Sequence, residues 1–185
     1  MKRDKVWLKV GKKPQIEVIT NLVSEFCEET YVSAGDGSSF EGRDHTFNLV
    51  HDLKELEGQG PLAGILSAME LDPESAWLVV AVDLPYLNSE TLRILISQRD
   101  PGQVATVYQS ASDGMPEPLC AIYEKKARTA LWNWVRHDKK CPRKFLIEQK
   151  VPLIVLKDKQ ALDNMNMPED WERACRHVSA DGGSK

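Results

Sequence analysis

The apolar positions of the chain recur with two different periods, and segments of the two kinds alternate. Ile16, Ile19 and Val23 lie three or four positions apart, which predicts a helix over 14–27. The run Trp77–Val82 is apolar without alternation, which is typical of a strand buried on both faces of a parallel sheet. By the same reasoning we expect helices over 60–71, from 88 or 89, over 125–135 and 143–148 and from 166, and strands at 30–34, 46–50, 104–108, 118–123 and 151–156. The alternation predicts a three-layer α/β/α sandwich around a mostly parallel, Rossmann-like sheet.

Length and composition fit one domain of ordinary globular type. The chain has 185 residues, of which 42% are hydrophobic and 28% charged, and this size suits a single core. We therefore expect one domain over 1–178, followed by a Gly- and Ser-rich flexible tail over 179–185. The run at 77–82 is too short to span a bilayer, and the lysine-interrupted start of the chain is not a signal peptide. These features favour a cytoplasmic protein that binds no membrane.

Charge and the metal-binding residue types narrow the classes of partner. The net charge of −4 argues against a nucleic-acid-binding protein, because neutralising a phosphate backbone needs a basic surface. One Lys or Arg can still serve the phosphate of a small molecule. The four cysteines form no Cys-x-x-Cys pair and the four histidines do not sit at ligand spacing, which argues against a zinc site and a disulfide framework.

Ligands of an open α/β sheet bind at the carboxyl ends of its strands, so polar residues that follow strands are the first candidates. Asp83 directly follows the run at 77–82, and its carboxylate could hold Mg²⁺, which binds one or two carboxylates together with substrate phosphates. Asp52 follows the strand at 46–50, and Gly60–Gly64 can bring a helix N-terminus close to a ligand. Position alone leaves the alternatives open, since Asp83 could equally cap a helix and Gly60–Gly64 could be a plain turn.

Four further polar residues have a structural explanation beside a functional one. Lys5 lies in the charged start of the chain, and Asn166 suits the N-cap of the last helix. Glu117 lies between two prolines and could be a surface residue, and Arg143 could grip a phosphate or decorate a helix. The common hydrolase, metalloprotease and P-loop motifs are absent from the sequence. The residues by themselves thus predict a soluble α/β domain with a metal-assisted phosphate site.

Five segments, taken in order, carry a resemblance that covers residues 1–171. The segments are Met1–Lys5, Asp52 with Gly60–Gly64, Val80–Tyr86, Gly114–Ala121 and Asn164–Asp170. Together they resemble the nucleotidyltransferases of the molybdenum cofactor guanylyltransferase (MobA) type. In the same order, they are similar to the family's signature loop, to its second motif, to its metal-binding strand end, to the segment before one of its later strands, and to its Asn-x-Asn-Thr-Pro-Glu-Asp signature.

The resemblance implies a fold like that of nucleotide-diphospho-sugar transferases. It also implies a reaction in which GTP and the terminal phosphate of molybdopterin combine with release of pyrophosphate. On this resemblance Asp83 ligates Mg²⁺, which bridges triphosphate oxygens, and Lys5 neutralises phosphate. Catalysis then consists of positioning and of cationic stabilisation, because phosphoryl transfer needs little covalent chemistry from the protein.

The same resemblance assigns the remaining candidate residues to the two substrates. Asp52 and Ser33 would contact the nucleotide, and the Asp52 carboxylate can accept from N1–H and the 2-amino group of guanine together. Arg143, Asn164 and Asn166 match positions that face the pterin phosphate side, and Arg143 joins Asp83 and Lys5 as a candidate catalytic residue.

The start of the chain departs from the family pattern. The family's loop reads roughly Leu-Ala-Gly-Gly-x-Ser-x-Arg-Met-Gly-x-Asp-Lys after a first strand, and this sequence begins at the loop's Met, with Lys2 where Gly is common. We therefore expect the domain over 1–178 to be incomplete at its N-terminus and residues 1–185 to bind GTP weakly.

Three hypotheses about function follow from this pattern. The first is a GTP-dependent enzyme, and the second is a related transferase that uses CTP or another phosphorylated acceptor. The third is a non-catalytic remnant that binds a molybdenum-cofactor maturation protein. In-frame residues upstream of Met1 that contain Ala-Gly-Gly and Ser-x-Arg would favour an enzyme.

Overall fold

The structure is a computed structural model that describes residues 5–35, 40, 46–165 and 168–181. Its α-helices are α1 (Gln15–Ser24), α2 (Pro61–Leu71), α3 (Ser89–Ser97), α4 (Lys125–Arg136), α5 (Pro142–Glu148) and α6 (Pro168–Asp181), with short 3-10 helices η1 (Lys5–Trp7) and η2 (Lys54–Leu56). Its strands are β1 (Lys9–Val10), β2 (Lys13–Pro14), β3 (Tyr31–Ala34), β4 (Asn48–His51), β5 (Trp77–Val80), β6 (Ala105–Gln109), β7 (Pro116–Tyr123) and β8 (Leu153–Val155). Each helix and strand predicted from the sequence is present, with ends that differ by a few residues. Among the described residues, no helix combines the length and the hydropathy that a membrane span requires.

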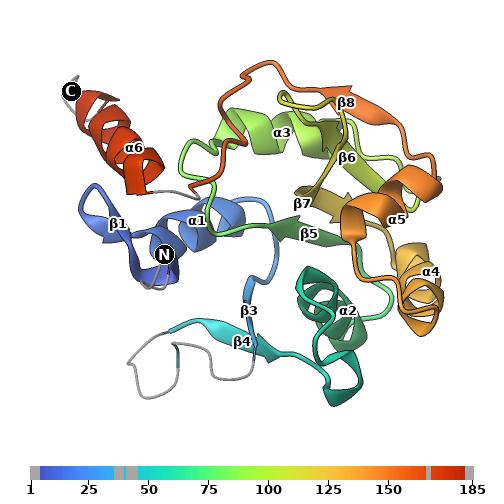
Figure 1. Ribbon diagram of the computed structural model, residues 1–185. Coiled ribbons are helices and arrows are strands. Elements are labelled where there is room, and N and C mark those ends of the chain that lie inside the picture. The colour runs from blue at the N-terminus through green and yellow to red at the C-terminus, as the bar shows by residue number, and fades with distance from the viewer. Residues whose placement is uncertain (1–4, 36–39, 41–45, 166–167, 182–185) are drawn as a thin grey trace.

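Four strands form the main sheet, in the order β5–β7–β6–β8 (Figure 1). Strand β7 runs antiparallel to both of its neighbours, whereas β6 and β8 are parallel. Strands β5, β6 and β8 therefore point in one direction, and β7 is the reversed member of these four. Strands β3 and β4 form a separate parallel pair. The α/β class is confirmed, with a mixed sheet in which one direction predominates.

Side chains of the main sheet alternate between two helical layers, which gives the molecule three layers. Val107 and Ala121 are paired in register and contribute to a core with helices α2, α4 and α5. Tyr108, the residue after Val107, and Cys120, the residue before Ala121, contribute to a second core with α1 and α3. This period of two is the pattern expected when both faces of a sheet are covered. Burial raises the pKa of the Cys120 thiol to about 12, so this cysteine is an inert core residue.

Strand β5 is less enclosed than its apolar sequence predicts. All four residues of Trp77–Val80 are half-buried rather than buried. The described sheet gives β5 one neighbour, β7, and Leu78 and Val80 line a cavity of about 200 Å³ that side chains of β3 and α1 border on the other side. The expectation of a strand buried on both faces is wrong here, because an apolar run does not determine how many neighbours a strand has.

Helix α6 is attached to a β-hairpin near the start of the described chain. The hairpin consists of β1 and β2, and the Trp171 indole N–H of α6 donates to the carbonyl of Lys9 at 3.0 Å. Val10, Met165 and Ala174 form a small buried cluster beside it. Helix α6 runs to Asp181, past the expected domain end at 178, and 182–185 lie outside the described residues.

Candidate functional site

Asp83 lies directly beyond the end of β5, in a turn that two hydrogen bonds hold in place. The backbone N–H of Met165 donates to the Asp83 carbonyl at 3.0 Å. The side-chain amide of Gln15, which is 1% exposed at the start of α1, donates to the carbonyl of Leu84 at 3.3 Å. These bonds hold the carbonyl groups of Asp83 and Leu84 in place. They therefore fix the position from which the half-buried Asp83 side chain extends.

Ser33, Asp52 and Gly64 come together at the carboxyl ends of β3 and β4. In the parallel register Ser33 pairs with Val50, so Asp52 follows β4 beside the end of β3. A Cβ placed on Gly64 of helix α2 would lie 3.1 Å from Ser33 Cβ, overlap Ser33 Oγ and reach 3.8 Å from Asp52 Oδ1. Helix α2 therefore approaches both side chains closely at Gly64.

The end of β5 lies beside this group. Val82, directly before Asp83, packs against a buried cluster that includes Val32 and Ala34 of β3. The end of β5 thus packs near β3, which pairs with β4. Of the residues that the resemblance assigns to the nucleotide, Ser33 lies in β3, Asp52 directly follows β4, and Asp83 lies three positions after β5.

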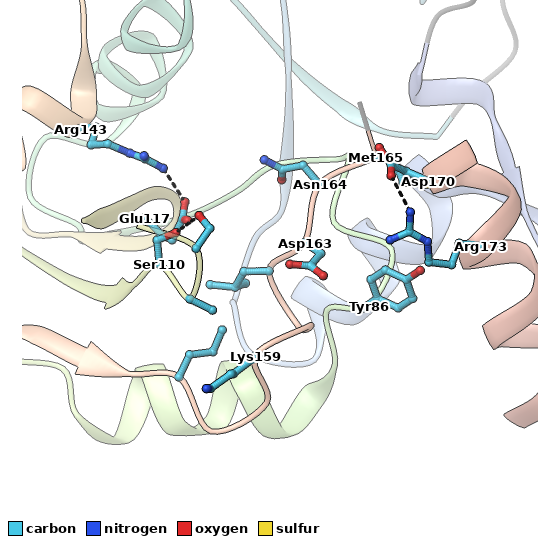
Figure 2. Close-up of a pocket in the computed structure, with 14 residues that line it drawn as sticks. Tyr86, Ser110, Glu117, Arg143, Lys159, Asp163, Asn164, Met165, Asp170 and Arg173 are labelled. Atoms are coloured by element: carbon cyan, nitrogen blue, oxygen red, sulfur yellow. Dashed lines mark hydrogen bonds and ion pairs between the residues drawn. The ribbon is translucent and has the colours of Figure 1, made fainter. Parts of the chain in front are cut away.

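A cavity of about 280 Å³ is lined in part by Met165, whose N–H binds the Asp83 carbonyl. Its polar lining includes Tyr86, Ser110, Ser112, Glu117, Arg143, Lys159, Asp163, Asn164, Asp170 and Arg173. Figure 2 shows the Arg143–Glu117 and Arg173–Asp170 pairs on opposite sides, with Asn164 and Asp163 between them. The predicted residues Arg143 and Asn164 therefore share one cavity.

Arg143 reaches the cavity from α5 and binds two carboxylates on the β6–β7 connection and β7. Its Nη1 donates to Asp113 Oδ2 at 2.8 Å and its Nη2 donates to Glu117 Oε2 at 3.2 Å. The Met115 backbone N–H, then the Ser110 hydroxyl and the Arg143 charge, lower the pKa of Asp113 below its usual range. Glu117, which the sequence analysis read as a plausible surface residue, is a partner of Arg143 and lines the cavity.

The structure leaves two predicted site residues outside its description. Asn166 lies outside the described residues, two positions after Asn164. Lys5 begins η1 at the N-terminal end of the described chain, and its side chain is not among those described.

Comparison with known proteins decides the family. A family profile described as a MobA-like NTP transferase domain matches residues 1–153, most of the chain. The chain belongs to the MobA-like NTP transferase family. Its members are nucleotidyltransferases, and the α/β sheet with polar strand ends described above agrees with this assignment.

Individual relatives of this MobA-like chain carry molybdenum-cofactor names. A Synechocystis protein named "Molybdenum cofactor biosynthesis bifunctional protein" is 33% identical over 171 residues, which cover 92% of this chain and 49% of that protein. A Bacillus mycoides protein named "Probable molybdenum cofactor guanylyltransferase" is 27% identical over 135 residues, covering 71% of this chain and 66% of that protein. This MobA-like chain thus spans about half the length of the Synechocystis protein and about two thirds of the length of the Bacillus mycoides protein.

A solved structure shows the same fold. The crystal structure of molybdopterin-guanine dinucleotide biosynthesis protein A from Archaeoglobus fulgidus superposes with a TM-score of 0.72, covering 97% of this chain and 92% of that one. The sequences of the two chains are 22% identical. At this identity the likeness establishes the fold of the MobA-like chain and leaves its substrates to be proposed.

The MobA-like chain offers a carboxylate that fits Mg²⁺ when the substrate supplies the other ligands of the ion. The described residues contain no group of three or more His, Cys, Asp and Glu side chains that could hold a metal ion. Asp83 offers hard carboxylate oxygens just beyond the carboxyl end of β5. Mg²⁺ is commonly held by one or two carboxylates with the remaining positions filled by phosphate oxygens and water, and Asp83 suits that mode.

Sequence reasoning missed several residues of the cavity. Lys159 and Asp163 lie in the segment between β8 and Asn164, and Arg173 lies one turn into α6. The rule that polar residues after strands line sites would have found Lys159 and Asp163, because they follow the last strand. The pairing of Asp113 with Arg143 carries no such signal, since it joins residues 30 positions apart.

Proposed function

We propose that the protein transfers GMP from GTP to the phosphate of molybdopterin, with Mg²⁺ and with release of pyrophosphate. The family and the names of the relatives support the reaction class and the acceptor. The observation that carries the proposal is the hydrogen bond from the Met165 N–H to the Asp83 carbonyl, at 3.0 Å. It joins the candidate metal ligand to the segment lining the cavity, so nucleotide and acceptor sites would meet at Asp83.

The proposed chemistry is a substitution at the α-phosphorus of GTP. An oxygen of the acceptor's phosphate forms a bond to the α-phosphorus, the bond from that phosphorus to the bridging oxygen of the β-phosphate breaks, and pyrophosphate leaves with the electron pair. Bound Mg²⁺ supplies compensation for the charge that grows on the triphosphate oxygens. The protein's own part is to hold the two reactants in line, which needs fixed binding sites on either side of Asp83.

The nucleotide side of the proposal rests on the group at the ends of β3 and β4. Asp52 would accept from N1–H and the 2-amino group of guanine, a pair of donors that cytosine and adenine do not present together. Ser33 would add a hydrogen bond from its exposed hydroxyl, and Lys5 would neutralise triphosphate charge. The short approach of Gly64 to Ser33 keeps this group compact.

The acceptor side rests on the 280 Å³ cavity. Asn164 is exposed to it and can both donate to and accept from a polar ring, and Asn166 follows in the same segment. Arg143 has two N–H groups engaged by Asp113 and Glu117 and others left to donate to an oxygen of the acceptor.

The test is nucleotide-dependent transfer by the longest in-frame product of the gene that contains residues 1–185. With molybdopterin and Mg²⁺, we expect pyrophosphate release with GTP to exceed that with CTP or ATP. Asp83→Asn should lower turnover about 100-fold, because a metal ligand loses its charge. Glu90→Gln, which neutralises an exposed carboxylate on α3, should leave turnover unchanged. Faster pyrophosphate release with CTP would refute GTP as the nucleotide substrate. Near-normal turnover by Asp83→Asn would refute the role of Asp83 as a metal ligand.

A further inference from the structure

The charges around the 280 Å³ cavity are unequally compensated. In the described part of the chain its cationic lining residues are Arg143, Arg173 and Lys159. Arg143 lies against two carboxylates, at 2.8 Å from Asp113 and 3.2 Å from Glu117. An anionic ligand beside Arg143 would therefore meet a group whose charge is already more than balanced.

Arg173 is compensated in the same way by a carboxylate of its own helix. Its Nη2 lies 3.3 Å from Asp170 Oδ1, an i,i+3 pair at the start of α6. Both arginines thus hold the walls of the cavity together, one tying α5 to β7 and the other stiffening the first turn of α6 (Figure 2).

Lys159 differs from both arginines. It is exposed, lines the cavity from the segment after β8, and forms no ion pair with any described residue. Asp163 of the same segment also lines the cavity, and neither it nor the adjacent Asp158 forms an ion pair with Lys159. A lysine ammonium is a compact charge on a flexible stem and suits the oxygens of a phosphate monoester.

We propose that Lys159 binds the phosphate monoester of the acceptor, and that Arg143 positions the cavity wall. This assignment rests on the proposed function for the identity of the acceptor. It pairs Lys159, the cavity's uncompensated cation, with the phosphate, which is the most highly charged group of the ligand. It also keeps the Arg143 bridge between Asp113 and Glu117 intact when the ligand binds. The phosphate held by Lys159 is then the group that attacks the nucleotide.

The test measures binding directly, without turnover, on residues 1–185. The probes are 6-hydroxymethylpterin phosphate and its dephosphorylated parent, followed by pterin fluorescence at low ionic strength. We expect the phosphate ester to bind more tightly than the parent. Lys159→Ala should weaken the ester about tenfold and leave the parent unchanged, since one charge-assisted contact is lost. Lys159→Arg should retain most of the affinity.

Lys157→Ala is the matched control, because Lys157 is exposed in the same segment but does not line the cavity. The Lys157→Ala variant should bind the ester with the same affinity as the unaltered chain. Equal losses in Lys157→Ala and Lys159→Ala would overturn the proposal, because they would indicate general electrostatic attraction. Equal binding of the two probes would overturn it as well. Lys159-dependent binding of the ester, together with no GMP transfer by the longest in-frame product, would refute the proposed function and retain the phosphate site.

Discussion

The Ser33 side chain occupies the space in which a side chain at Gly64 would begin. A Cβ on Gly64 would lie 3.1 Å from Ser33 Cβ and overlap Ser33 Oγ. The contact joins the first turns of α2 to the end of β3, 31 positions apart in the sequence by subtraction of the two residue numbers. The same contact sets how closely the helix approaches the candidate nucleotide group.

Gly64→Ala should therefore lower the free energy of unfolding by about 1 kcal/mol. Overpacking costs about 1–3 kcal/mol, and the better helix propensity of Ala offsets about 1 kcal/mol of that. Denaturant unfolding measures the change. Adding Ser33→Ala removes the overlapping hydroxyl, so the double variant should be more stable than Gly64→Ala alone. An equally unstable double variant would contradict the contact.

Arg143→Lys should raise the KM for the acceptor about tenfold in the longest in-frame product, because a lysine cannot bridge two carboxylates in a fixed geometry. The ion pairs to Asp113 and Glu117 would not both form, and the cavity wall would loosen. Steady-state kinetics at saturating GTP measure the effect. Arg136→Lys, at an exposed position of α4, is the control. An unchanged KM in Arg143→Lys would contradict the positioning role.

Glu70 should make stability depend on acid pH. Its carboxylate accepts from the Trp132 indole at 2.6 Å and from Arg128 at 3.1 Å, and the Trp132 bond, followed by Arg128, lowers its pKa below the ordinary 4.5. A lowered folded-state pKa contributes stability above the unfolded value, and this contribution is lost as pH falls through the folded value.

Glu70→Gln should then lower stability by about 0.5–1 kcal/mol at neutral pH, a small value because solvent screens the partly exposed pair. The stabilities of the two proteins should converge as pH falls below 4.5. Urea titrations across this range give the comparison, and a difference that persists or grows in acid would be evidence against the assignment.

The arrangement of helices and strands was largely predictable because local patterns determine it. The apolar spacing of Ile16, Ile19 and Val23 and the proline at the start of α2 both mark helices that the structure contains. Asn88, one of the two positions from which we expected this helix to start, caps α3 by accepting from the Thr91 N–H at 2.9 Å. The direction of β7 was not predictable, because antiparallel and parallel neighbours present similar apolar alternation.

The site was only partly predictable, because its ion pairs join distant segments. Strand ends indicated Asp52 and Asp83, and the resemblance added Ser33, Arg143 and Asn164. The partners of Arg143 lie 30 and 26 residues away, and no local pattern specifies such a pairing. What sequence could not show is that these acids already balance Arg143, which is the reason for assigning the phosphate to Lys159.

The fate of the α-phosphorus of GTP tests the central claim most directly. GTP labelled at either the α or the γ position is incubated with Mg²⁺, molybdopterin and the longest in-frame product. The account predicts that α label moves into a guanine dinucleotide of the acceptor while γ label appears in pyrophosphate, in equal amounts. Label released as inorganic phosphate, or α label that never joins the acceptor, would contradict it.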